Sequence, residues 1–293
     1  MAWLPLLAQL PRETVRTAAW LIALLAVFVP LERIFALHRQ RMLRRAFASD
    51  VLYYFLSNLL PRILLIVPLS ALAWTIHQIL PGGPYPLAAS LPLWARLTGA
   101  QIVGECGAYW GHRLMHRIPA LWRFHAVHHS AEEMDWLVNT RAHPLDILIT
   151  KLCELTPMYL LGLAQPQGNA ADAVPVLVVI VGSLWSFFIH ANLNWRFGWL
   201  EWLISTPGFH HWHHTRDPRY ADRNFAPLLP WVDAIFGTLY LPAREWPDAY
   251  GTDTPVAGSI GGQLLDPFTE SRLARDRFAR PARPAASPAA PGS

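Results

Sequence analysis

The chain contains few charged residues and almost no cysteine. Of its 293 residues, 15% are Asp, Glu, Lys or Arg, whereas 53% are hydrophobic and 14 are tryptophan. This composition is typical of an integral membrane protein and argues against an ordinary soluble domain. The two cysteines, Cys106 and Cys153, are too few for a disulfide framework. Because both lie in apolar stretches, we expect them to be small core residues.

Several common signatures of redox proteins and hydrolases are also missing. The sequence has no dinucleotide fingerprint, no Cys-rich iron–sulfur motif and no appended haem domain. It has neither an HExxH motif nor a nucleophile elbow, which disfavours a membrane hydrolase. The net charge of +4 comes without a basic patch that carries base-stacking aromatics, so no nucleic-acid partner is expected.

Apolar segments are long and numerous. Because a membrane span needs roughly 20 mostly apolar residues, we expect spans or half-spans at residues 17–37, 51–77, 91–111, 145–164 and 173–189. Pro61 and Arg62 predict a tilt or kink in the second segment. The last two segments form a predicted hairpin around the polar turn 165–169. Asp146, Lys151 and Glu154 in its first arm should face protein or a cavity, since intramembrane charges seldom face lipid.

Histidine is abundant and clustered. Apart from His38 and His77, which we expect at the membrane interface, every histidine lies in one of five clusters between residues 112 and 214. Spacings of three and four place imidazoles on one helical face, where they can meet. So many imidazoles would need more than one metal ion, since one ion takes about four to six ligands. The candidate ligands are His112, His116, His125, His128, His129, His143, His190, His210, His213 and His214.

Imidazole ligands alone do not identify the metal. Zinc, copper, iron and nickel all accept neutral imidazole, so a structural zinc site in a non-redox membrane protein stays open as an alternative. A metal transporter would place its ligands near the midplane of its spans, whereas these clusters follow the span ends. The extra His211 inside the last cluster is expected to support the ligands from outside or to lie at the surface.

One basic loop predicts the orientation. Residues 38–45 carry the densest run of arginine near a span, which favours the cytoplasmic side for this loop. Counting spans from there brings all five histidine clusters to the same side. We therefore predict an all-α fold, a multi-pass membrane helical bundle of about four to five spans or half-spans. Its histidine-rich helical metal site would lie on the cytoplasmic face, in a bacterial inner membrane.

Prolines predict where the site-bearing helices begin. Pro119 cannot continue the helix before it but suits the first turn of a helix that carries His125 and its neighbours. Pro144 similarly suits the start of the next helix. Thr206 is a predicted N-cap of a helix that begins at Pro207 and presents the last cluster. Several helix ends would then converge just below the bilayer.

The order and spacing of the clusters resemble a known superfamily. HxxxH at 112–116, HxxHH at 125–129, RxHP at 141–144, HxN at 190–192 and TPxxHxxHH at 206–214 are similar to the fatty acid hydroxylase and sterol desaturase superfamily of membrane di-iron oxygenases. The resemblance covers about residues 97–241. Glu105, Ala226 and Trp231 depart mildly from the usual pattern, which bears on the substrate class more than on metal binding.

The resemblance implies an activity and its partners. Two irons would bind and reduce dioxygen and then attack an unactivated C–H bond of a lipid or isoprenoid chain at the membrane face. Hydroxylation is the first expectation and desaturation the second, because both begin with hydrogen abstraction. Since the sequence has no electron-transfer motif of its own, a separate reductase, ferredoxin or cytochrome-type donor would dock on the Arg-rich cytoplasmic face.

Acidic residues near the clusters are candidates for holding the ligands. A ligating imidazole needs its second nitrogen fixed by a carboxylate or carbonyl, and the candidates are Glu105, Asp146, Asp222 and Asp233. Glu105 precedes His112 by seven residues and so shares its helical face. A capping or salt-bridging role is the alternative, above all for Asp222 and Asp233. Arg113 and Arg141 are expected to pair with such acids.

These features divide the chain into four parts. Residues 1–96 hold the N-terminal spans and loops, and residues 97–241 form the catalytic domain with its membrane hairpin. Residues 242–273 are a C-terminal extension. The Pro- and Ala-rich residues 274–293 are a predicted disordered tail.

Overall fold

The computed structural model describes residues 4–83, 85–164 and 173–269, and over these residues the fold is helical, with two isolated β-bridges and no extended strand. The turn 165–169 and the tail 274–293 therefore lie outside the described residues. The long helices are α1 (Leu4–Ile34), α2 (Phe47–Leu64), α3 (Ile66–Ile79), α5 (Leu93–Arg117), α7 (Pro144–Leu160) and α8 (Val174–His190). The short ones are α4 (Tyr85–Ser90), α6 (Pro119–His125), α9 (Pro207–His213), α10 (Trp231–Ile235) and α11 (Ile260–Thr269), with 3₁₀ turns η1 (His128–Ser130), η2 (Trp136–Thr140) and η4 (Gly198–Trp202).

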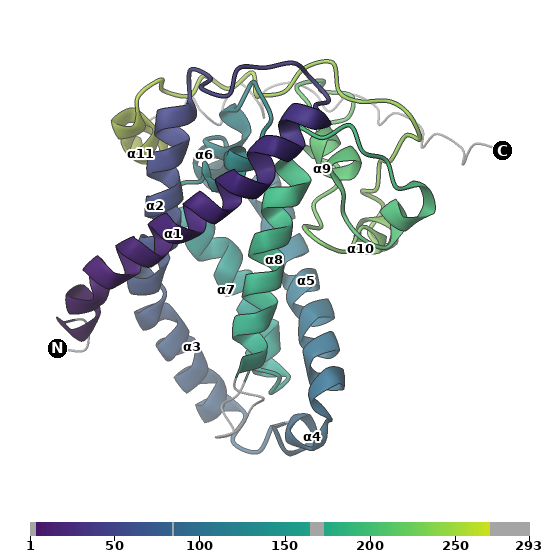
Figure 1. Cartoon of the computed structure of the whole chain (residues 1–293). Helices are drawn as coiled ribbons and strands as arrows, with labels where there is room; N and C mark the ends of the chain where they lie inside the picture. The colour runs from purple at the N-terminus through teal and green to yellow at the C-terminus, as the bar shows by residue number, and fades with distance from the viewer. Residues whose placement is uncertain (1–3, 84, 165–172, 270–293) are drawn as a thin grey trace.

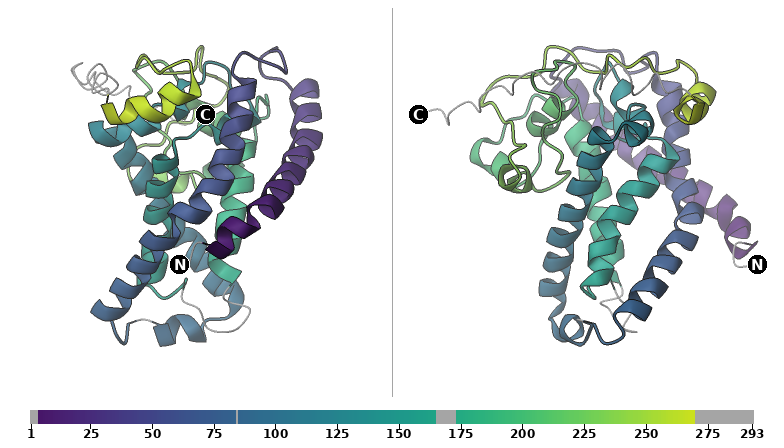
Figure 2. Two further views of the ribbon diagram at one scale, coloured as in Figure 1. Left: turned by 90° about the vertical axis from the view of Figure 1, so that its left-hand side faces the viewer. Right: turned by 180° about the vertical axis from the view of Figure 1, so that it is seen from behind.

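The long helices form a bundle, and the short helices α6, α9 and α11 lie at one end of it (Figure 1). α5, α7 and α8 stand side by side, α2 and α3 run along them, and α1 crosses the outside of the bundle obliquely (Figures 1 and 2). The connection from α3 to α4 lies at the opposite end from α6, α9 and α11 (Figure 1). The Arg-rich loop between α1 and α2 lies at the same end as these short helices (Figure 1).

The most extensive helix contact joins α5 and α7. It depends on glycine, because a Cβ added at Gly107 would lie 2.1 Å from the carbonyl oxygen of Cys153, and one added at Gly111 would lie 2.7 Å from the Cβ of Cys153. Small residues let two backbones approach closely, as in packed membrane helices. Cys153 is accordingly a packing residue, as predicted for the cysteines.

Two helical segments among the described residues are long and apolar enough to cross a membrane, Ala8–Ile34 and Phe47–Ile79. The second comprises α2 and α3, and its helix is interrupted at Leu65, four residues after the Pro61 that predicted a kink. Large apolar side chains on these helices point outward, among them Trp20 and Trp74. Of the five predicted segments, α8 is apolar but has 17 residues, and α5 and α7 carry several polar side chains.

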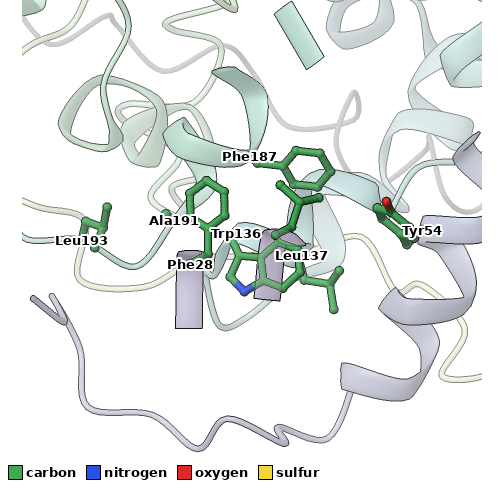
Figure 3. Packing of buried hydrophobic residues seen from close by; sticks show 8 residues of the cluster. Phe28, Tyr54, Trp136, Leu137, Phe187, Ala191 and Leu193 are labelled. Carbon is green, nitrogen blue, oxygen red and sulfur yellow. The ribbon is translucent and has the colours of Figure 1, made fainter. Parts of the chain in front are cut away.

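An aromatic cluster fastens the first two helices to the rest of the fold (Figure 3). Phe28 of α1 stacks on Trp136 of η2, with ring centroids 5.7 Å apart. Tyr54 of α2 and Phe187 of α8 complete the contact, with ring centroids 6.4 Å apart. This packing holds η2, which lies between two of the histidine clusters in sequence, against α1, α2 and α8.

Candidate metal centre

The structure collects nine of the ten candidate ligands into two neighbouring groups. Within each group, one ring nitrogen from every member lies within 4.8 Å of those of the others. The first group contains His112, His116, His125, His129 and His213, and the second contains His128, His190, His210 and His214. The groups adjoin, since the rings of His129 and His214 stack with centroids 4.5 Å apart. All are buried except His112, which is half-buried.

The local structure explains how the sequence cluster 125–129 contributes ligands to both groups. Pro119 begins α6 as predicted, but the helix ends at His125 and a 3₁₀ turn carries His128 and His129. The expectation of a single helical face for these three histidines is therefore wrong. The change of helix type sends His128 to the second group, while His125 and His129 stay in the first.

The last cluster lies on α9, which begins at Pro207 as predicted. Thr206 occupies the N-cap position, but its side chain makes no capping hydrogen bond; its hydroxyl donates to Glu201 instead. α9 presents His210 to the second group, together with His214, and His213 to the first group. The helical spacing alone does not predict this division, because residues three and four apart share a face.

The nitrogen positions fit metal coordination. Two ligand nitrogens that are each about 2.1 Å from one metal ion lie roughly 3.0 to 3.4 Å apart at the usual coordination angles. The observed Nε2–Nε2 distances fall in this range, and they are 3.0 Å for His112–His125, 3.2 Å for His125–His129, 3.3 Å for His128–His190, 3.0 Å for His190–His210 and 3.2 Å for His210–His214. The buried Nε2 of His213 has no hydrogen-bond partner in the described structure, which a ligand atom would not need. The donor set therefore fits a pair of borderline metal ions.

Most of the grouped histidines have their second ring nitrogen hydrogen-bonded to a residue outside the two groups. Six Nδ1 atoms lie 2.7 to 3.0 Å from an acceptor oxygen. The acceptors are the Phe225 carbonyl for His112, Asp222 for His116, Asp146 for His125, the Arg141 carbonyl for His128, the Ser186 carbonyl for His190 and the Arg223 carbonyl for His213. A proton donated from Nδ1 leaves Nε2 with its lone pair facing the group.

Of the four acidic candidates, two contact an imidazole directly and two contact backbone N–H groups. Asp146 and Asp222 contact a histidine directly, at 2.9 and 3.0 Å. Glu105 instead accepts from the backbone N–H groups of residues 228 and 229, at 2.7 and 2.8 Å. Asp233 accepts from the N–H groups of residues 225 and 226, both at 2.8 Å, and from the hydroxyl of Thr238. The last two thus fix the loop whose Phe225 carbonyl holds His112, and neither touches an imidazole.

Two further histidines of the sequence clusters, His143 and His211, lie outside both groups. His143, a candidate ligand, accepts at Nδ1 from the Leu145 N–H as the N-cap of α7, and its Nε2 lies 3.1 Å from the Leu264 carbonyl. His211 is fully buried rather than at the surface, with Nδ1 2.9 Å from the Tyr250 hydroxyl. His143 therefore joins α7 to α11, and His211 joins α9 to the segment around Tyr250.

Burial favours the neutral form of five of the grouped histidines. The pKa values of His128, His129 and His214 are lowered well below the usual range, first by burial and then by the charge that neighbouring imidazoles would carry. The pKa values of His210 and His213 are lowered well below it for the same reasons. Neutral imidazole is the form that binds metal, so these five imidazoles can coordinate at neutral pH.

A buried ion network next to the second group was missed in the sequence. Arg44 contacts Asp135 and Asp50, both at 2.6 Å, and Arg141 contacts Asp50 at 2.7 Å. Arg141 thus pairs with an acid as predicted, but with a different one, and its carbonyl holds His128. Arg113 instead donates to the Tyr109 hydroxyl at 2.8 Å. The available signal was Asp50 itself, an acid immediately before the predicted apolar segment 51–77 and in the first turn of α2.

Both histidine groups border one cavity of about 280 Å³. Its walls come from α2, α5, α7 and α8, together with the segments that carry the histidines. Most of the wall surface is apolar. The histidines that line it are His112 and His125 from the first group and His128, His190 and His210 from the second. A small molecule in this cavity would therefore meet both groups at once.

Sequence comparisons find relatives for the histidine-bearing part of the chain. Residues 97–238 match the profile of the family described as fatty acid hydroxylase. The chain is 34% identical over 169 residues to an ornithine lipid hydroxylase of Rhizobium tropici, covering 57% of this chain and 49% of that protein. It is 30% identical over 152 residues to the alkylglycerol monooxygenase of Homo sapiens, covering 52% of this chain and 32% of that protein.

A more distant relative is a very-long-chain aldehyde decarbonylase of Oryza sativa subsp. indica, 28% identical over 174 residues, which are 54% of this chain and 26% of that protein. The chain thus spans about half the length, or less, of the curated relatives that it matches. No solved structure matches the chain.

Proposed function

We propose that the chain is a member of the fatty acid hydroxylase family, whose profile residues 97–238 match. We propose further that it is a membrane-bound di-iron oxygenase that hydroxylates an unactivated C–H bond of a lipid. Desaturation of the same class of substrate is the second possibility for this site, because it begins with the same hydrogen abstraction. The relatives named ornithine lipid hydroxylase and alkylglycerol monooxygenase support a lipid substrate.

The cavity shared by the two histidine groups is the observation that carries the proposal. A structural zinc site needs no access for a small molecule, and its ligand set is closed. Here five of the nine grouped histidines line a cavity with mostly apolar walls. An apolar chain in that cavity would lie beside both groups, which suits a reaction at carbon.

The residues of the chain have separate tasks in this reaction. Iron bound by the two groups would supply the reduction of dioxygen and the oxidising power for the C–H bond. The nine grouped histidines hold the ions, and Asp146 and Asp222 hold two imidazoles with Nε2 facing inward. The cavity walls orient the chain and keep water away from the reacting carbon.

Electrons come from a separate donor protein in this proposal. The loop between α1 and α2 lies at the histidine-bearing end of the bundle (Figure 1), and its Arg39, Arg41 and Arg45 are exposed. A basic surface attracts an acidic reductase, ferredoxin or cytochrome-type partner. If the enzyme turned over fully without a chemical reductant and without added donor protein, this part of the proposal would be contradicted.

We further propose a multi-pass arrangement in a bacterial inner membrane. Ala8–Ile34 and Phe47–Ile79 provide two spans, and α5, α7 and α8 would complete the bundle within the bilayer. The Arg-rich loop then favours the cytoplasm for the end that carries the metal centre. The catalytic part is the predicted segment 97–241, and the first 96 residues anchor it.

The test is metal content with Mössbauer spectroscopy on detergent-purified protein expressed with iron-57. Wild type should contain two coupled irons per chain, and His128→Ala should lose the iron of the second group and with it the coupling, because His128 belongs to that group. His143→Ala is the matched control, since His143 lies outside both groups and should leave iron content unchanged. Stoichiometric zinc after iron-replete expression, without oxygen consumption, would instead support the structural zinc alternative.

A further inference from the structure

The two histidine groups differ in the residues that hold their imidazoles. Asp146 and Asp222 each accept a hydrogen bond from an imidazole of the first group, at 2.9 and 3.0 Å. Among the described residues, the imidazoles of the second group make hydrogen bonds outside their group only to the carbonyl oxygens of Arg141 and Ser186. A carboxylate partner raises the basicity of a ligating imidazole, and such outer partners strengthen metal binding. The first group therefore has the stronger ligands.

The second group also contains two ring nitrogens without support. The Nδ1 atoms of His210 and His214 are buried and make no hydrogen bond in the described part of the chain. The Nε2 atoms of the same two rings lie 3.2 Å apart, facing each other within the group. To offer both Nε2 lone pairs to an ion, each ring must carry its proton on Nδ1. This leaves two buried N–H donors without an acceptor, which opposes metal binding in the second group.

Buried charge favours the first group as well. A buried ion is costly unless opposite charge lies beside it. Asp146 contacts no Lys or Arg side chain among the described residues, so its negative charge is available to an ion in the first group. The buried network next to the second group is neutral as a whole, because Arg44 and Arg141 balance Asp50 and Asp135. That network therefore adds no negative charge for a second ion.

The second group is the more accessible of the two. Three of its four histidines line the cavity, His128, His190 and His210, whereas only His112 and His125 of the five in the first group do so. A closed ligand set is typical of a tightly held ion, and an open one is typical of an ion that accepts other ligands. The second group thus combines weaker ligands with greater access.

From these differences we propose that the first group binds its ion tightly and that the second group binds its ion weakly and exchangeably. The proposal rests on the proposed function, because it concerns the same metal centre, and it adds a regulation of that centre. At iron concentrations between the two dissociation constants, a chain holds one ion and lacks the pair. The supply of iron then controls activity through the second group.

The experiment measures metal binding without lipid, dioxygen or reductant. Full-length protein in detergent is freed of metal with a chelator and titrated with Co²⁺, whose visible absorption reports binding to imidazole. Wild type should bind two Co²⁺ per chain in two steps. The dissociation constants should differ by about 100-fold or more, because each of two outer carboxylates strengthens binding by roughly tenfold or more.

Three variants assign the two steps. Asp222→Asn should weaken the tight step by about tenfold or more and leave the weak step unchanged. Its backbone φ of 62° is one that asparagine also adopts, so this variant should fold. His190→Ala should abolish the weak step and keep the tight one. Asp253→Asn is the matched control, since it removes a carboxylate of an exposed pair and should change neither step.

Several results would overturn the proposal. They are two steps of equal affinity in wild type, a tight step that disappears in His190→Ala, and an Asp222→Asn variant in which only the weak step changes. Turnover separates this proposal from the one on which it rests. With donor protein, lipid and dioxygen present, the hydroxylation rate should rise only at iron concentrations that fill the weak step.

The two proposals can fail independently. Two unequal binding steps in a protein that consumes no dioxygen when loaded with iron and reduced would refute the oxygenase function and leave the inequality of the groups standing. Lipid hydroxylation by a protein whose two steps have equal affinity would refute only the inequality.

Discussion

A single methyl group at Gly107 should disturb the metal centre from a distance. In α5 this residue faces the backbone of α7, and a Cβ there would lie 2.1 Å from the carbonyl oxygen of Cys153. Contacts of this kind below about 3 Å are not tolerated in a close-packed interior. Gly107→Ala therefore forces α5 and α7 apart by about 1 Å, since a backbone carbonyl cannot rotate away as a side chain can.

The expected cost is that of overpacking, about 1 to 3 kcal/mol. For a chain of this size, that lowers the melting temperature by roughly 2 to 4 °C per kcal/mol. The displacement also separates ligands from their supports, because α5 carries His112 and His116, whereas α7 carries Asp146, which holds His125. Iron content should fall even where the protein stays folded.

Gly99→Ala is the matched control on the same helix. A Cβ at Gly99 would meet its nearest atoms at 3.9 Å, which is ordinary van der Waals contact. Alanine is the better helix former by about 0.5 to 1 kcal/mol, so this variant should be as stable as wild type or more so. Both variants are assayed by thermal unfolding in detergent and by iron per chain. Wild-type melting temperature and iron content in Gly107→Ala would refute the reasoning.

Three further predictions concern charge. Asp146→Asn should weaken iron binding about 10- to 100-fold, measured by competition with a chelator, because the amide no longer holds its imidazole as a carboxylate does. Asp50→Asn should cost about 3 to 5 kcal/mol of stability in denaturant unfolding, since two buried arginines lose their shared partner; Asp253→Asn, in an exposed pair, should cost under about 1 kcal/mol. Replacing Arg39 and Arg41 with Gln should slow donor-dependent turnover in stopped-flow assays at low salt and have little effect at high salt. An effect independent of salt would exclude electrostatic docking there.

The histidine clusters were predictable because their chemistry is local in sequence. Spacings of three and four, with prolines at 119, 144 and 207, indicate where ligand-bearing helices begin, and the structure begins α6, α7 and α9 at those residues. That the candidate ligands are imidazoles can be identified from the sequence alone. The same holds for the kink after Pro61 and for the apolar character of the first two helices.

The division of the ligands between two groups was not predictable in this way. It depends on α6 ending at His125 and on a 3₁₀ turn that redirects His128. His143 has the same side chain as the grouped histidines, and only its position as the N-cap of α7 keeps it apart. Likewise, Glu105 precedes His112 by seven residues, but the partners of Glu105 and of Asp233 are backbone N–H groups.

The sequence alone therefore determined which kinds of atoms the protein offers and roughly where its helices begin, because imidazole spacing and proline act through neighbouring residues. Only the tertiary structure decided which nitrogens share a point, which acids hold them, and that Gly107 and Asp50 support the site from afar. Those relations join residues that are tens of positions apart in the chain. They are set by close packing and by the pairing of buried charges, which no local pattern encodes.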